Sequence, residues 1–182
     1  MRIPLLSAAV IGALLLSGCA AGADAAPEPS TPAASSAAGS DSGTDASCSG
    51  VEVVVDFGIL DSPSVTECID ASAPIASADA IAAAGVATEG NADYGDAVVC
   101  RVDGRPAADE TVTVPGEAPF TEPCSAMSPA YAFWALWVKP APEADWEFAM
   151  EGLATLKSEP GQSVGLVYTT GSGTEPQPPA AD

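Results

Sequence analysis

The sequence contains no histidine, and it has only five lysine and arginine residues against 25 aspartate and glutamate residues. Without histidine, the chain lacks the base of a Ser-His-Asp triad and the imidazole that commonly ligates metals. Its formal net charge of −20 repels nucleic acid and anionic lipid headgroups. The composition therefore excludes histidine-dependent chemistry and argues against a nucleic-acid partner.

The sequence also lacks an apolar run long enough to cross a membrane comfortably. Its longest run covers residues 3–16 and follows Arg2, whereas a transmembrane helix needs about 20 apolar residues. One cation, a short apolar run and then small residues are typical of a secretory signal peptide. Because Leu16-Ser17-Gly18-Cys19 resembles the lipobox of bacterial lipoprotein precursors, we expect a signal peptide over 1–18 and a lipid on Cys19. The alternative is an ordinary cleaved signal with an unmodified cysteine.

Residues 20–47 contain no branched aliphatic or aromatic side chain. Such a segment cannot bury enough apolar surface to offset the entropy of ordering. With the lipidated cysteine, it predicts a disordered tether over residues 19–47. Residues 171–182 have a similar composition and predict a disordered tail. The remaining residues, 48–170, are the expected folding unit, which is long enough for one core.

Turn residues divide the folding unit into short segments. Ser77 as a helix N-cap and Gly85 as the stop predict a short helix over residues 77–84, and Asp103-Gly104 predicts a tight turn that folds the chain back on itself. β-Branched and aromatic runs predict strands. The expected strands are residues 51–57, 97–102, 111–114, 131–139, 146–150 and 164–169. One short helix and about six strands, with 131–139 as a central strand, predict an α+β fold.

Beyond Cys19, four cysteines remain, and they allow three pairings. Disulfides persist outside the cytoplasm. We predict Cys48 with Cys68 and Cys100 with Cys124, because each pair closes a short loop rich in turn residues. The competing interpretation, a four-thiolate zinc site, has neither the usual C-x-x-C spacing nor a histidine.

Motifs that suggest catalysis are weak. Residues 161–165 match the G-x-S-x-G nucleophile elbow, but that elbow needs a strand before its serine and a helix after it, whereas Ser163 precedes a predicted strand. The acid pairs Asp56/Asp61 and Glu67/Asp70 lack calcium-loop spacing. No set of acid, base, nucleophile and metal ligands can be assembled. We therefore expect a protein that is not an enzyme and has no metal or cofactor.

Aromatic residues make up only 5% of the chain, yet several of them lie close together. Alternation along a strand would place Tyr131, Phe133 and Trp137 on one face and Trp134 on the other. Trp146 follows nearby. Such residues either fill the core or form a platform for a ligand.

The order of these segments resembles a bacterial secreted domain of unknown function that is similar to the C-terminal domain of transcobalamin and intrinsic factor. The matching segments are the strand at 51–57, the helix at 77–86, Tyr94-Gly95, the V-V-C-R-V-D-G run at 98–104 and the F-W-A-L-W strand at 133–137.

The resemblance implies a β-grasp-like domain outside the cell, associated with cobalt or cobalamin uptake, with a corrinoid as its ligand. Carried over to this chain, the ligand-binding positions are Tyr94, Phe133, Trp134 and Trp137, to which we add Trp146 as a neighbour. Leu136 and Val138 stand where relatives often have tyrosine and histidine. Without histidine, any corrinoid contact would be stacking and hydrogen bonding.

The sequence is compatible with two functions. The first is a lipid-anchored, monomeric module that binds a small extracytoplasmic ligand and passes it to a membrane transporter. The second is a structural or interaction lipoprotein that engages another envelope protein through its acidic surface or a sheet edge.

Overall fold

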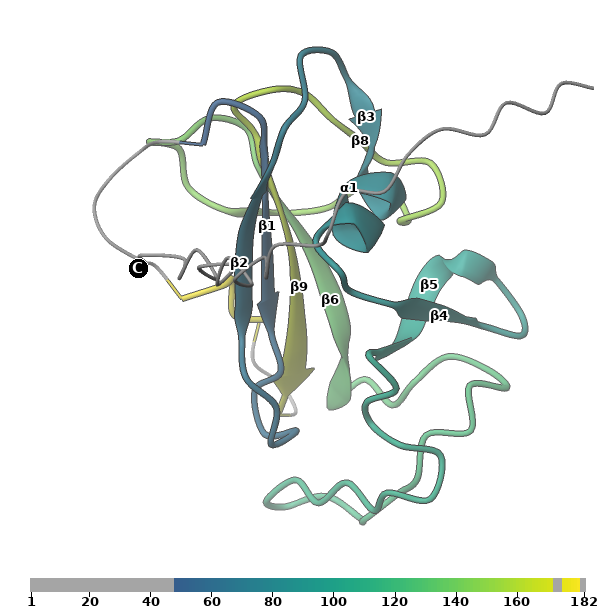
Figure 1. Cartoon of the computed structure of the whole chain (residues 1–182). Helices are drawn as coiled ribbons and strands as arrows, with labels where there is room; N and C mark the ends of the chain where they lie inside the picture. The colour runs from purple at the N-terminus through teal and green to yellow at the C-terminus, as the bar shows by residue number, and fades with distance from the viewer. Residues whose placement is uncertain (1–47, 172–174, 181–182) are drawn as a thin grey trace, which may run out of the picture. The chain divides into compact units, whose positions relative to one another are not determined.

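The computed structural model describes residues 48–171 and 175–180 (Figure 1). Over these residues the protein is mostly β-structure, with one short helix and two disulfides. This agrees with the expected small α+β domain. Among the described residues, no helix has both the length and the hydropathy to cross a bilayer. The predicted signal peptide, Cys19 and the predicted tether lie outside the described residues.

The main sheet is mixed and has the strand order β2-β1-β9-β6-β7. At its centre, β1 (Val51–Asp56) runs parallel to β9 (Ser163–Thr170), and β6 (Ala132–Lys139) pairs antiparallel with β9. The edges are β2 (Val65–Ile69) and the two-residue β7 (Glu147–Phe148). Figure 1 shows β2, β1, β9 and β6 side by side. The first and last strands of the domain thus meet at the centre of the sheet.

The inner face of this sheet packs into the main core. Alternate residues of β1, Val51, Val53 and Val55, are completely buried, whereas the residues between them are partly exposed. Helix α1 (Ser77–Ala83) contributes the buried Ile81 to the same cluster. Full burial of one such side chain contributes about 1.5–3 kcal/mol. This alternation therefore determines which side of each strand faces the core.

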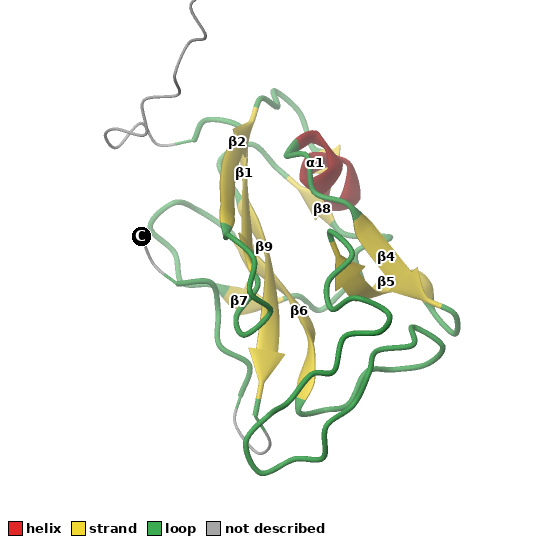
Figure 2. Cartoon of the chain, turned by 60° about the horizontal axis from the view of Figure 1, so that its bottom comes forward, coloured by secondary structure: helices red, strands yellow, loops and turns green. Residues whose placement is uncertain are grey.

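Two small sheets accompany the main one. β4 (Thr88–Asn91) and β5 (Gly95–Val102) form an antiparallel hairpin, and β3 (Ile75–Ala76) pairs with β8 (Lys157–Ser158). In both views the hairpin lies on the β6 side of the main sheet, away from β2 (Figures 1 and 2). The segment that follows the hairpin, residues 103–131, contains no strand and is drawn as loop in Figure 2.

Most of the predicted elements are confirmed. Strands are present within 51–57, 97–102, 131–139, 146–150 and 164–169, and the helix begins at Ser77 as expected. The strand at 131–139 lies inside the sheet, with β9 on one side and β7 on the other. The predicted pairing of the four cysteines is also confirmed.

Three predictions need correction. Residues 111–114 form no strand, because only an isolated bridge joins Val112 to Phe120. Ser77 does not cap the helix; the N-cap is Ala76, and the buried Ser77 hydroxyl instead bonds Ser158 Oγ at 2.8 Å. The Asp103-Gly104 turn does form, with reciprocal hydrogen bonds between Val102 and Arg105. However, it does not lead into a partner strand, since β5 pairs with the preceding β4.

Four strands, β2, β3, β4 and β8, were not predicted. β3 and β8 have only two residues each, too few to show a period. β2 and β4 are largely exposed, so neither carries the apolar alternation that marks a half-buried strand.

The outer face of the sheet carries a smaller apolar cluster around Ala135, Trp137 and Val167, with Phe133 and Trp146 at its border. The composition of residues 171–182 predicts a disordered tail. Its described residues, 171 and 175–180, have no secondary structure, but Pro179 is buried.

Candidate functional site

An apolar cleft of about 630 Å³ lies beside β6. It is bounded by β5, by residues 127–130, by β6 with Leu166 of β9 behind it, and by residues 148–153. Small-molecule sites commonly have volumes of about 300–1,000 Å³ and predominantly apolar walls. The cleft therefore has the size and chemistry of a ligand site.

The mouth of the cleft exposes large apolar side chains to solvent. Of the five large apolar residues that are exposed among the described residues, three line this cleft: Met127, Phe148 and Met150. Met150 is 95% exposed. An exposed apolar patch of this kind commonly marks a binding surface, and the unbranched methionine side chain adapts its shape to different apolar partners.

The cleft exists because β7 is short. It pairs only with Trp137 and Val138 of β6, so the earlier part of β6 has no strand neighbour on that side among the described residues. The chain after β7 remains attached through one hydrogen bond, from Ala149 N to Leu136 O at 2.9 Å. It then diverges from the sheet, and the space between becomes the cleft.

Gly152 closes the far end of the cleft against β5. A Cβ at this position would lie 2.5 Å from Ala97 O and 3.0 Å from Ala97 Cα. Such distances are below any normal contact, so only glycine permits this close approach of the two backbones. The position of residues 148–153 relative to β5 thus depends on the missing side chain.

Trp134 forms the inner wall of the cleft, and the core holds it rigidly. Its ring makes edge contacts with Phe57 at 5.3 Å and with Tyr168 at 5.4 Å between centroids. Its indole Nε1 donates a hydrogen bond to Arg105 O at 3.1 Å. Because the polar atom of Trp134 is already satisfied within the protein, the part of the ring that faces the cleft is apolar.

Arg101 fastens the long segment after β5 to the hairpin. The guanidinium donates to Glu89 Oε1 and to Pro106 O, both at 2.9 Å, and to Glu122 O. The Cys100–Cys124 disulfide makes a second link between β5 and the same segment. These links hold in place the chain that leads to Met127, on the rim of the cleft.

The cleft carries little charge. Among its lining side chains only Ser128 and Glu151 are polar, apart from the bonded indole of Trp134, and none is cationic. Burial, and to a smaller extent the charges of Glu122 and Glu110, raises the pKa of the nearby Tyr168 well above its usual range. The cleft suits a neutral or cationic apolar ligand better than an anion.

The predicted ligand-binding residues do not form one site. Phe133 and Trp134 line the cleft, and Phe133 also packs against the outer cluster. Trp137 and Trp146 belong to the cluster on the outer face of the sheet, and Tyr94 is 58% exposed at the turn between β4 and β5. The structure thus separates the five residues into three locations.

The predicted alternation of aromatic residues along β6 holds within the strand. Trp134 packs into the main core, whereas Trp137 and Phe133 belong to the outer cluster. Tyr131 differs from the prediction: it precedes β6 and packs against the main core, with Phe120 at 5.7 Å between ring centroids. Alternation cannot be extended past the end of a strand.

Sequence analysis missed Met127, Phe148 and Met150. These residues occur singly in irregular or very short segments, where no apolar period distinguishes them. Only the folding of three distant segments against β6 brings them together.

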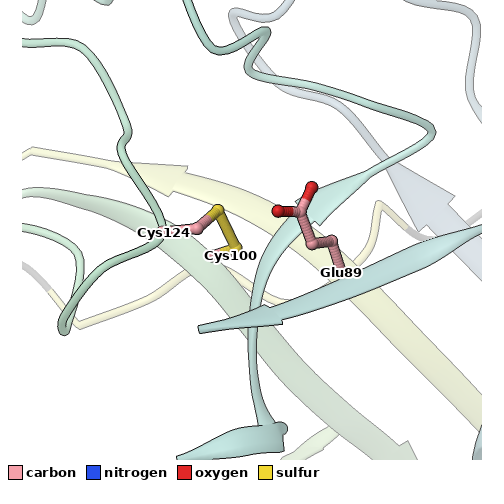
Figure 3. A group of neighbouring side chains, drawn as sticks. All are labelled: Glu89, Cys100 and Cys124. Atoms are coloured by element: carbon pink, nitrogen blue, oxygen red, sulfur yellow. A yellow bond between two sulfur atoms is a disulfide. The ribbon is translucent and has the colours of Figure 1, made fainter. Parts of the chain in front are cut away.

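One group of metal-ligand types occurs among the described residues, formed by Glu89, Cys100 and Cys124 (Figure 3). Both sulfur atoms are consumed in the disulfide, and the Glu89 carboxylate pairs with Arg101 at 2.9 Å. A thiolate site needs deprotonated free cysteines, so this group is a structural link. The two disulfides themselves indicate an oxidising, extracytoplasmic environment.

The other weak motifs also have structural roles. Ser163 is the first residue of β9, and its Oγ bonds Glu52 Oε2 at 2.8 Å; the strand–turn–helix of a nucleophile elbow is absent at this position. Asp56 Oδ1 accepts a hydrogen bond from Gly58 N at 2.8 Å and stabilises the turn after β1. Asp61, Glu67 and Asp70 are exposed to solvent.

Comparison with known proteins does not extend this description: no family model matches the chain, and neither a curated protein nor a solved structure matches it.

Proposed function

We propose that this protein is a non-catalytic, extracytoplasmic binding module that holds an apolar small molecule, neutral or cationic, in the cleft beside β6. The cleft itself carries the proposal, because it combines the volume of a ligand site with nearly all-apolar walls. Its rim supports the proposal further, because Met127, Phe148 and Met150 leave apolar side chains exposed at the mouth of the cleft.

The proposed cellular arrangement follows from the N-terminal sequence. A lipid on Cys19 would anchor the protein to the outside of the cell membrane, with residues 20–47 as a tether. A domain held in this way can pass its ligand to a membrane transporter. The acidic surface would disfavour direct adsorption to anionic headgroups, so attachment would depend on the acyl chains.

A corrinoid is the most specific ligand that the sequence resemblance suggests. The sheet order, with the first and last strands parallel at the centre and α1 packed on one face, supports the β-grasp-like part of that resemblance. Phe133 and Trp134 are the two carried-over positions that a ligand in the cleft would touch. Tyr94, Trp137 and Trp146 would not contact such a ligand.

The test uses the chain from Ala20 to Asp182 and two dyes that differ mainly in charge. Neutral N-phenyl-1-naphthylamine should bind saturably with micromolar affinity, and anionic 8-anilinonaphthalene-1-sulfonate should bind much more weakly. Cobalamin and cobinamide are titrated in parallel, with tryptophan fluorescence and calorimetry as readouts. Saturable binding of either corrinoid would identify the ligand class.

A cleft-filling variant locates the binding. Ala130→Trp places a large ring at the exposed lining position Ala130 and should weaken the neutral dye at least about tenfold, or about 1.4 kcal/mol. Ala82→Trp adds the same ring to an exposed helix position outside the cleft and should change nothing. The proposal is wrong if the neutral dye fails to bind the folded wild-type protein, or if both variants bind it equally well.

A further inference from the structure

The outer face of the main sheet has an aromatic surface centred on a glycine. Gly165 of β9 pairs with Trp137 of β6, which pairs in turn with Phe148 of β7. Trp137 and Phe148 make an edge contact at 5.5 Å between centroids. A Cβ on Gly165 would lie 3.2 Å from the ring of Trp146. We call Trp137, Trp146, Phe148 and Gly165 the aromatic face.

A proline from the end of the chain occupies this face. A Cβ on Gly165 would approach Pro179 Cγ to 2.7 Å, a distance that real Cβ atoms do not reach. Pro179 is buried although the residues on both sides of it are exposed. The absence of a side chain at Gly165 thus makes the depression that receives the Pro179 ring.

Burial in the terminal segment repeats every three residues. Within Glu175-Pro176-Gln177-Pro178-Pro179-Ala180, Pro179 is buried and Pro176 is half-buried, whereas the other four residues are exposed. A spacing of three residues matches one turn of a polyproline II helix, the conformation in which P-x-x-P peptides bind aromatic-lined grooves. The contact of the segment with the sheet is at Pro179.

The same face holds two unpaired polar atoms. Among the described residues, the only buried side-chain N or O atoms without a hydrogen-bond partner are Trp137 Nε1 and Thr169 Oγ1. Strand alternation places Thr169 on the same side of β9 as Gly165. Residues 175–180 make no hydrogen bond to either atom, so the contact of this segment with the aromatic face is apolar.

From Pro179 seated at Gly165 beside Trp146, and from the three-residue spacing of the two less exposed prolines, we propose that the aromatic face is a binding site for an extended, proline-rich peptide. Residues 175–180 of the same chain are its resident ligand, held reversibly in cis. The short connection from Gly171 keeps the local concentration of this ligand in the millimolar range. A separate peptide can bind only when the resident segment has left. This inference does not rest on the proposed cleft function, although Phe148 belongs to both surfaces.

The experiment compares the chain from Ala20 to Asp182 with its P176A/P179A variant. Each is titrated with the hexapeptide Glu-Pro-Gln-Pro-Pro-Ala while tryptophan fluorescence and heat are recorded. The variant should bind the peptide saturably, because its own segment no longer competes. The wild type should bind it about threefold more weakly. A peptide with alanine at its second and fifth positions, those of Pro176 and Pro179, serves as the matched control and should bind neither protein.

A further substitution tests the location of the site. Adding Gly165→Ala to the P176A/P179A variant should abolish peptide binding, because the new methyl group fills the depression. Trp146→Ala in the same background should weaken binding even if G165A disturbs the sheet. Binding of N-phenyl-1-naphthylamine by the P176A/P179A chain should not change, which separates this site from the cleft. The inference is wrong if the folded P176A/P179A chain does not bind the peptide, or if the wild type binds the peptide as tightly as that variant does.

Discussion

The two faces of the main sheet are covered in different ways. The inner face packs against α1 and other segments far apart in sequence, and both the Cys100–Cys124 disulfide and Arg101 hold the neighbouring loop in place. The outer face carries a small apolar cluster, and Pro179 from the terminal segment packs against it at Gly165. Because the inner cluster is much larger than the outer one, we expect the inner side to supply most of the stability of the domain.

Removing the Cys100–Cys124 disulfide should have the largest effect, because it links β5 to the loop around the cleft. The two cysteines are 24 residues apart, and a loop of that size corresponds to about 3 kcal/mol in the chain-entropy model. The double variant C100A/C124A should lose roughly that amount in urea unfolding. It should also bind the neutral dye more weakly than the wild type. An unchanged midpoint would show that the loop is held by Arg101 alone.

The faces can be compared directly with two adjacent valines of β1. Val53 is completely buried on the inner face, and Val54 is half-buried on the outer face. Val53→Ala should lower the free energy of unfolding by about 2 kcal/mol, from lost burial plus a residual cavity. Val54→Ala should cost less than about 1 kcal/mol. Equal losses in denaturant unfolding would contradict the difference between the faces.

Releasing the terminal segment should change stability only slightly. Pro179→Ala removes the ring seated at Gly165, and we expect a loss below about 1 kcal/mol, since only a few atoms are uncovered. Pro178→Ala, at the exposed neighbouring position, is the control and should have no measurable effect. Both are followed by thermal unfolding. A loss for P179A as large as that for V53A would make the segment part of the permanent core.

The smallest expected effect concerns Glu110 and depends on pH. Burial raises the pKa of this carboxyl, but hydrogen bonds from the Arg105 side chain and from Ala107 N, together with the charge of Arg105, outweigh burial and lower it below its ordinary value of 4.5. A lowered folded-state pKa adds stability above the unfolded pKa, and this stability is lost as pH falls through the folded pKa.

Glu110→Gln should therefore lower the thermal midpoint slightly at pH 7, and the difference from the wild type should vanish well below pH 4.5. Asp109→Asn, at an adjacent exposed position, should show no such convergence. A difference that persists at low pH would mean that Glu110 acts through packing instead of charge.

Much of the fold was predictable because local patterns agree with it. The β-branched run of β1, the apolar run of β6 and the apolar segment that follows the turn before β9 all form strands of the main sheet. The cysteine pairing followed from short loops rich in turn residues. The prediction of a strand at 111–114 was wrong, because this segment pairs with the rest of the chain only through the isolated bridge between Val112 and Phe120.

The candidate site was predictable only in part. The aromatic pattern on β6 identified Phe133 and Trp134 as ligand-binding candidates, and both line the cleft, but the same pattern also included Trp137, which does not. Met127 and Met150 carry no sequence signal, because each occurs alone in an irregular segment. A cleft made by three segments far apart in the chain requires their tertiary arrangement.

The sequence by itself predicted the helix, five of the nine strands that the described residues form and both disulfides, and it excluded histidine chemistry, because each of these depends on neighbouring residues or on composition. Tertiary structure alone decided that β7 ends early and leaves a cleft, that Gly152 lets two backbones meet, and that Gly165 receives Pro179. Each of these depends on contacts between residues distant in sequence. At Gly152 and Gly165, the absence of a side chain leaves the space for those contacts, and local secondary-structure propensity does not reveal it.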